Sequence, residues 1–152
     1  MMPLVAYNYA SKNYKRMKDF TRATQLTSIA AALVFIGASE IFAPQIIRLF
    51  IGDAKTIRYG ADFLRIACLA TPFVITNFQK IYSLQAMGKG KESLILSVCR
   101  QGLFAIPILF ITNHFVGLYG VVASQLISDA ITFILSTAIY RKVYNDLQKD
   151  MV

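Results

Sequence analysis

The chain has 152 residues, of which 56% are apolar and only 16% are charged, and its formal net charge is +8. A soluble domain carries about a quarter charged residues, whereas here the charges are clustered between long apolar runs and the mean hydropathy is positive. This pattern argues against a nucleic-acid binder and is typical of an integral membrane protein, whose basic residues gather in loops on one side. Both cysteines lie inside apolar runs, so neither a disulfide framework nor a zinc site is predicted.

Residues 1–22 are basic and rich in tyrosine. Five basic side chains, opposed by one aspartate, stand within eleven positions: Lys12, Lys15, Arg16, Lys18 and Arg22. Positively charged loops are retained in the cytoplasm, and the nearby tyrosines suit the headgroup level of a bilayer. We therefore expect residues 1–22 to form a cytoplasmic loop, and a loop of this kind need carry no chemistry.

Four apolar segments follow this loop, and each is long enough to span a membrane. About twenty apolar residues cross the hydrocarbon core as a helix, and Pro72 should kink the helix that contains it. The fold class predicted from this pattern is an all-α integral membrane protein with four transmembrane helices and a cytoplasmic tail. The helices are expected at residues 23–50, 61–88, 93–113 and 117–140, and the tail at 141–152.

The distribution of basic residues gives an orientation. Of the sixteen Lys and Arg residues, ten fall in residues 1–22, 89–91 and 141–152, four fall between residues 48 and 65, and two lie within predicted helices. The excess of positive charge marks the cytoplasmic side. We therefore expect a multi-pass protein of the cell inner or plasma membrane, embedded in the lipid bilayer, with both chain ends in the cytoplasm.

Apart from Glu40 and the charges near the outer ends of the spans, three charged residues lie inside the predicted spans: Lys80, Arg100 and Asp129. Charges within a bilayer are costly, and they usually face a cavity or pair with one another. The helical rise places all three in the cytoplasmic half or at the midplane, so we expect Asp129 to be ionised and held by Arg100, with Lys80 nearby. Two interpretations stay open, a device for packing and register or a site that couples to a cation or a substrate.

Polar neighbours accompany these charges on the same segments. They either line a water-filled cavity or form hydrogen bonds between helices. Glu40, near the far end of the first span, is expected to be a hydrated carboxylate at the membrane–water interface. The candidate substrate or cation cavity comprises Asp129, Arg100, Lys80, Asn77 and Gln79, and further polar neighbours are Thr76, Gln85, Gln101, Ser124, Gln125 and Ser128.

Enzyme motifs do not occur in the sequence. There is no HExxH, no GxSxG, no Gly-rich phosphate loop and no pair of histidines, so metal-assisted hydrolysis and nucleotide-driven pumping lack their residues. The single histidine, His114, is interpreted as a polar residue at an interface. We predict that the protein is not an enzyme and that it holds no metal and no cofactor.

Several motifs together resemble one family of transporters. The segment Pro3-x-x-x-Tyr7-Asn8-Tyr9-Ala10-x-Lys12-Asn13-Tyr14-x-Arg16 resembles the loop after the second helix of each half in multidrug and toxic compound extrusion (MATE) transporters. The resemblance covers essentially the whole chain, and this first motif is the most specific. Further matches are Pro44-x-x-x-x-Leu49-Phe50, Gln85-Ala86-Met87-Gly88-Lys89, and Arg100-Gln101 with Pro107.

The resemblance implies a function and a place within a longer protein. MATE transporters have twelve helices in two lobes and export cationic compounds in exchange for Na⁺ or H⁺. This chain resembles the last four helices of the second lobe, so residues 1–22 would follow a truncated eighth helix. We expect a fragment or a truncated gene product, which would not transport alone and whose partners would be the missing N-terminal lobe and a small cationic substrate.

The sequence also departs from the family pattern. Where some branches carry an acidic cation ligand in the middle of the tenth helix, this chain has Asn77, Gln79 and Lys80. The acidic residues of the first lobe have no counterpart here. Two alternatives therefore stay open: a lipid-linked polysaccharide flippase, for which a more basic cavity is expected, and a non-transporting membrane subunit or remnant whose helices only pack.

Overall fold

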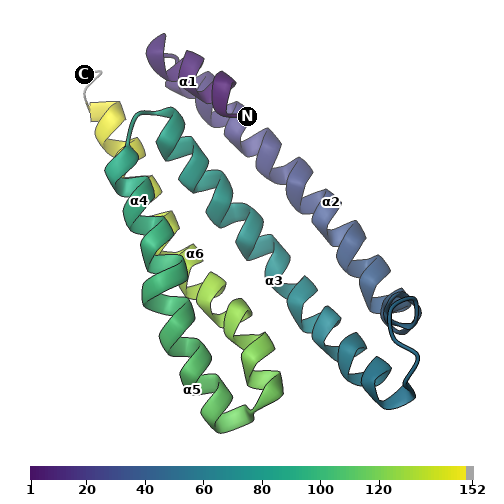
Figure 1. Ribbon diagram of the computed structural model, residues 1–152. Helices are drawn as coiled ribbons and strands as arrows, with labels where there is room; N and C mark the ends of the chain where they lie inside the picture. Colours follow the sequence, from purple (N-terminus) through teal and green to yellow (C-terminus); the bar gives the residue numbers. More distant parts are fainter. Residues whose placement is uncertain (150–152) are drawn as a thin grey trace.

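The computed structural model describes residues 1–149 as a bundle of long helices (Figure 1). Helix α3 lies between α2 and α6, and α6 also packs along α5. The α4, η1 and α5 segments follow one another without a break, and η1 is a π-helix. The elements are α1 (Met2–Ala10), α2 (Tyr14–Arg48), α3 (Ala54–Ala86), α4 (Gly90–Val98), η1 (Cys99–Ala105), α5 (Ile106–Val116) and α6 (Leu118–Lys149).

Four helical stretches of the described chain are long and apolar enough to cross a membrane, as predicted. Each has at least 27 residues, more than the twenty or so that a bilayer requires. The all-α membrane fold is therefore confirmed. The stretches are Tyr14–Arg48, Ala54–Ala86, Gly90–Val116 and Leu118–Leu147.

The predicted loop at residues 1–22 is largely helical instead. Pro3 stands in the first turn of α1, where its missing N–H costs nothing. Asn13 caps α2, and its side chain accepts a hydrogen bond from the backbone N–H of Arg16. Lys12 has a φ of 56° and turns the chain between the two helices. Only residues 11–13 separate α1 from α2, because this cap starts α2 well before the apolar run.

The other helices also extend beyond the apolar runs that predicted them. Helix α3 begins at Ala54 rather than at residue 61, because Asp53 caps it there. Helix α6 continues through most of the predicted tail, since Val143 and Leu147 are buried in the core. Residues 150–152 of that tail lie outside the described residues. The helices therefore continue into the polar segments beside the apolar runs. The apolar runs locate only the parts that cross the membrane.

Proline affects two of the spans differently. Helix α3 runs through Pro72 as one helix. In the third span, η1 ends just before Pro107, which lies in the first turn of α5. A proline interior to a helix lacks an N–H and clashes with the preceding turn, and a wider π-helical turn relieves such strain. The wider turn contains Arg100, one of the predicted site residues.

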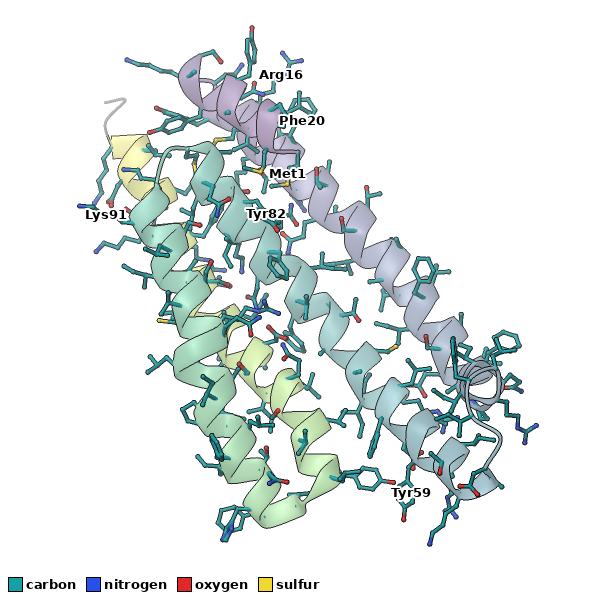
Figure 2. All side chains as sticks on the ribbon, viewed as in Figure 1. Met1, Arg16, Phe20, Tyr59, Tyr82 and Lys91 are labelled. Atoms are coloured by element: carbon teal, nitrogen blue, oxygen red, sulfur yellow. The ribbon has the colours of Figure 1, made fainter. Side chains whose placement is uncertain are left out.

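The apolar core lies at one end of the bundle, where α1 packs against α2 and α3. We call this the α1 end; the α2–α3 loop and the α5–α6 turn form the opposite end. Figure 2 shows Arg16 and Lys91 at the α1 end and Tyr59 at the opposite end. Outward-facing side chains such as Phe35 and Phe110 are exposed, as lipid contact requires. The core consists of Val5, Met17, Ile81, Leu84, Met87, Leu96, Val143 and Leu147.

A close approach of backbones joins α5 to α6. Gly117, with a φ of 67°, forms the turn between them. A Cβ atom at Gly120 would overlap the backbone carbonyl of Thr112 on α5. Small residues allow membrane helices to pack at this distance.

We predict that Gly120→Ala pushes α5 away from α6 and lowers stability by about 1–3 kcal/mol, the usual cost of overpacking. The measurement is the temperature at which half of the detergent-solubilised protein stays monodisperse after heating. Gly37→Ala is the matched control, because nothing lies within 4 Å of a Cβ atom at Gly37. Equal midpoints for the two variants would contradict the close packing.

Asp53 makes the start of α3 sensitive to acid. Its carboxylate accepts hydrogen bonds from the Thr56 hydroxyl at 2.6 Å and from the Thr56 backbone N–H at 2.8 Å. These bonds hold the pKa of the Asp53 carboxyl below its ordinary value, and the bond from the Thr56 hydroxyl has the larger effect. A depressed pKa in the folded state gives stability that is present above the unfolded pKa of about 3.9 and lost as the pH falls through the folded value.

We therefore expect the first turn of α3 to fray below about pH 3.9. Amide hydrogen exchange of residues 54–58, corrected for its intrinsic pH dependence, should become faster in that range. Asp53→Ala should exchange fast at every pH, because it has no carboxylate to protonate. Equal protection of the unmodified chain at pH 3 and pH 6 would show that the cap contributes nothing.

Candidate functional site

A buried ion pair joins the π-helical turn η1 to the middle of α6. Arg100 Nε lies 2.6 Å from Asp129 Oδ1, and the two side chains are 7% and 0% exposed. Gln125, one turn earlier on α6, donates a hydrogen bond to Asp129 Oδ2. Both carboxylate oxygens therefore have donors, as a buried charge requires. The predicted pairing of Asp129 with Arg100 is confirmed.

Asn77 connects α3 to this pair. Its Nδ2 atom donates to the backbone oxygen of Asp129 at 3.0 Å, and its Oδ1 atom accepts from the Ser136 hydroxyl at 2.9 Å. One fully buried amide on α3 thus spans two turns of α6. We call Asn77, Arg100, Gln125, Asp129 and Ser136 the polar network. It fixes the relative register of three elements, α3, η1 and α6.

Lys80 does not contact Asp129 directly. Its ammonium group donates to the Thr137 hydroxyl and, at 3.5 Å, to the Ser136 hydroxyl. The same group lies 4.3 Å from the centroid of the Phe133 ring, in cation–π geometry. Lys80 is therefore near the polar network, as predicted, but it meets the network at Ser136.

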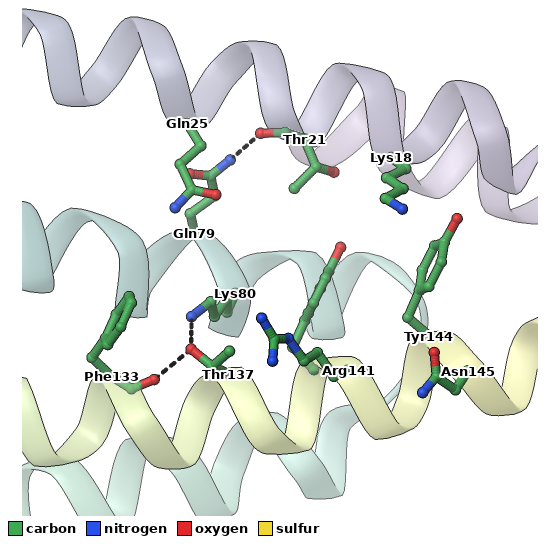
Figure 3. A pocket seen from close by; sticks show the side chains of 11 residues that line it. Lys18, Thr21, Gln25, Gln79, Lys80, Phe133, Thr137, Arg141, Tyr144 and Asn145 are labelled. Atoms are coloured by element: carbon green, nitrogen blue, oxygen red, sulfur yellow. Dashed lines mark hydrogen bonds between the residues drawn. The ribbon is translucent and has the colours of Figure 1, made fainter.

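A cavity of about 570 Å³ lies on the other side of Lys80, between α2, α3 and α6 (Figure 3). We call it the basic cavity, because three of its eleven lining residues are cationic and none is acidic. Of the five predicted cavity residues, only Gln79 and Lys80 line it. The lining residues are Lys18, Thr21, Gln25, Gln79, Lys80, Phe133, Thr137, Tyr140, Arg141, Tyr144 and Asn145.

Gln79 is a buried polar residue at the wall of this cavity. Its Nε2 atom donates to the backbone oxygen of Thr21 on α2. Its Oε1 atom is buried and has no protein donor. Gln25 on α2 donates to the hydroxyl of Thr76 at 3.4 Å. These amides are the polar links between α2 and α3 at the depth of the cavity, and Gln79 leaves one acceptor oxygen unused.

The remaining predicted polar residues divide into two groups. Ser128 is buried, and its hydroxyl donates to the backbone oxygen of Arg100 at 3.2 Å. Gln85 and Gln101 are exposed and join neither the polar network nor the basic cavity.

Sequence reasoning missed Lys18 and Arg141 as cavity residues. The spacing of 18, 21 and 25 on α2, and of 133, 137, 140, 141 and 144 on α6, is the helical periodicity that would have indicated shared faces.

A second charged cluster lies at the opposite end of the bundle. Arg65 Nε is 3.4 Å from Glu40 Oε2, and Arg65 Nη1 is 3.7 Å from Asp62 Oδ1. Asp62 also accepts a hydrogen bond from the Tyr119 hydroxyl at 2.9 Å. The Glu40 side chain is 44% exposed, and its expected position at the membrane interface stays a prediction. Exposed pairs of this kind contribute little to the stability of the protein.

Within residues 1–149, no group of three His, Cys, Asp or Glu side chains is placed to hold a metal ion.

The sequence is similar to proteins of a known family. The family model described as MatE matches residues 1–111. The chain belongs to the MatE family. It is 29% identical over 150 residues to the multidrug export protein MepA of Staphylococcus haemolyticus, a match that covers 99% of this chain and 33% of the relative. It is 30% identical over 131 residues to MepA of Staphylococcus aureus, covering 86% of this chain and 29% of the relative. The chain thus spans about a third of the length of the curated relatives it matches.

Two solved structures share the fold. The crystal structure of the Vibrio cholerae MATE transporter VcmN in its bent form superposes with a TM-score of 0.88 at 18% identity, covering 96% of this chain and 33% of that one. An inward-facing multidrug resistance MATE transporter of the MOP superfamily gives a TM-score of 0.90 at 20% identity, covering 97% and 35%. The MatE chain therefore has the fold of one third of a MATE transporter and is a multi-pass membrane protein.

We predict that Arg100→Met destabilises the protein by about 3–5 kcal/mol, because it leaves a fully buried carboxylate without its counterion. The double variant Arg100→Met/Asp129→Asn should recover part of this loss, because the uncompensated charge is gone. Thermal stability in detergent measures both. Arg65→Gln is the control and should cost no more than about 1 kcal/mol, since its ion pairs are exposed. An Arg100→Met loss as small as that of the control would contradict a paired, buried Asp129.

Proposed function

We propose that this chain is the C-terminal part of a secondary active multidrug efflux antiporter that exports cationic or amphipathic compounds in exchange for Na⁺ or H⁺. Membership of the MatE family and the similarity to the MepA multidrug export proteins support the proposal. The observation that carries the coupling step is Asp129, a carboxylate with 0% exposure in the middle of a membrane-spanning helix. Intramembrane carboxylates of this kind commonly serve ion or proton pathways.

Arg100 and the transported ion would compete for Asp129. While Arg100 Nε stays 2.6 Å from Asp129, the carboxylate is neutralised by the protein itself. Binding of H⁺ or Na⁺ to Asp129 replaces that neutralisation and releases the guanidinium. The π-helical turn that carries Arg100 is a place where the backbone can return to α-helical geometry. An ion can shift a conformational equilibrium only by its difference in affinity between two states, and this exchange of partners supplies such a difference.

The proposed transporter requires partners that this chain does not contain. Matches that cover 29–33% of the relatives leave about two thirds of a transporter to be supplied. We infer that a further N-terminal lobe packs against these helices in the lipid bilayer and shares a central substrate path with them. The excess of Lys and Arg at the α1 end supports a cell-membrane orientation with that end in the cytoplasm.

The test places this chain in a full-length context. A chimera replaces the segment of the Staphylococcus haemolyticus MepA protein that matches this chain with residues 1–152, and efflux of ethidium from energised cells is measured. We expect the chimera to export ethidium, and we expect Asp129→Asn to slow export at least tenfold, because an amide has no charge to exchange with an ion. The amount of protein in the membrane should stay the same.

Asp62→Asn is the matched control, because Asp62 is half-exposed at the opposite end and outside the polar network. Its export should equal that of the unmodified chimera. Unchanged export by Asp129→Asn would remove the coupling role. Loss of the Asp129→Asn protein from the membrane would indicate that Asp129 serves packing alone.

A lipid-linked polysaccharide flippase is the second candidate, and the basic cavity is the observation that favours it. Cationic residues without carboxylates suit an anionic linker group better than a cationic drug. This candidate would be favoured by a chimera that inserts normally and has the thermal stability expected of an intact Arg100–Asp129 pair, but does not export ethidium.

A further inference from the structure

Three cations line the basic cavity, and they come from three different helices. Lys18 belongs to α2, Lys80 to α3 and Arg141 to α6. Figure 3 shows these side chains around one opening. Lys18 and Arg141 are exposed, and Lys80 is partly buried. The cavity is therefore a positively charged hollow that opens toward solvent and ends inside the bundle.

No carboxylate balances this charge within the described residues. The ion pairs that residues 1–149 form involve Arg65 and Arg100 as the cations, not the three cations of the cavity. Lys80 instead contacts hydroxyls and the Phe133 ring. Like charges in a concave site with low-dielectric walls focus a positive potential. A charged occupant of opposite sign would therefore be favoured.

Uncharged hydrogen-bonding groups surround the cations. Tyr140 and Asn145 supply a hydroxyl and an amide to the lining. The Oε1 atom of Gln79 is a buried acceptor without a protein donor. A phosphate group has oxygens for ammonium and guanidinium donors, and a phosphate that keeps a hydroxyl, or that carries a glycerol hydroxyl, can donate to Gln79. A cavity of about 570 Å³ lies within the range of ligand sites.

We propose that the basic cavity binds a phosphate group through Lys18, Lys80 and Arg141. The group belongs either to the headgroup of an anionic phospholipid or to a free phosphate. The cavity would not hold a cationic drug, because the aromatic face at Phe133 is already occupied by Lys80 and the three cations repel a fourth. This inference does not depend on the proposed export function, because the phosphate group would bind in the basic cavity whichever compound is transported.

The test uses the purified chain and two probes. In the first arm, native mass spectrometry counts phosphatidylglycerol and phosphatidylcholine retained from mixed micelles. In the second arm, inorganic phosphate is added to the chain in phosphatidylcholine nanodiscs, and its thermal stability is followed. We expect a gain in one of the two arms. Arg141→Gln or Lys18→Gln should weaken that binding about fivefold, the usual effect of one basic residue on an anionic lipid surface.

Lys142→Gln is the matched control. It removes the same charge at the next position of α6, but Lys142 does not line the basic cavity. Phosphatidylglycerol retention that falls only with the cavity variants supports a lipid headgroup. A thermal shift with inorganic phosphate that falls in the same way supports a free anion. No gain in either arm, or an Arg141→Gln effect equal to that of Lys142→Gln, overturns the proposal.

Discussion

Helices that cross a bilayer must satisfy their polar groups within the protein, because lipid tails offer no hydrogen bonds. Asp129 meets this constraint in its most demanding form, since a charge near the bilayer centre costs a few kcal/mol or more. Arg100 neutralises the charge, Gln125 donates a hydrogen bond to the second carboxylate oxygen, and Asn77 donates to the backbone oxygen of Asp129. Each donor must lie at a fixed position along the axis of α6 for these bonds to form. The position of η1 along α6 therefore depends on one carboxylate, whereas that of α3 depends on the backbone oxygen of the same residue and on Ser136.

Two different forces hold the two parts of the bundle together. At the α1 end, buried apolar side chains such as Met17, Leu84 and Leu96 form a core of the kind found in soluble proteins. Toward the middle, the buried apolar residues of α2 and α3 are small, as at Ala32 and Ala70. Lipid removes the hydrophobic drive between helices there, so hydrogen bonds and close backbones maintain the packing.

Sequence reasoning found the four spans and the Arg100–Asp129 pair, because both follow from local rules: an apolar run must be helical in lipid, and a buried charge needs a partner. It missed the helices within residues 1–22, because Asn13 as a cap and Val5 as a core residue matter only once α1 has packed on the bundle. It also grouped Asn77 with Lys80. Both residues contact Ser136 on α6, but only Lys80 also lines the basic cavity, and the packing of the helices decides this.

Lys80 lies between the two charged regions and connects them. It reaches the basic cavity on one side and the hydroxyl of Ser136 on the other, and Ser136 donates to the amide oxygen of Asn77. An anion bound in the cavity, as we propose, would attract the ammonium away from Ser136. Ser136 and Asn77 would then redistribute their hydrogen bonds, one of which joins Asn77 to the backbone oxygen of Asp129. Coupling between two sites is reciprocal, so the charge state of Asp129 would in turn alter the affinity of the cavity for its anion.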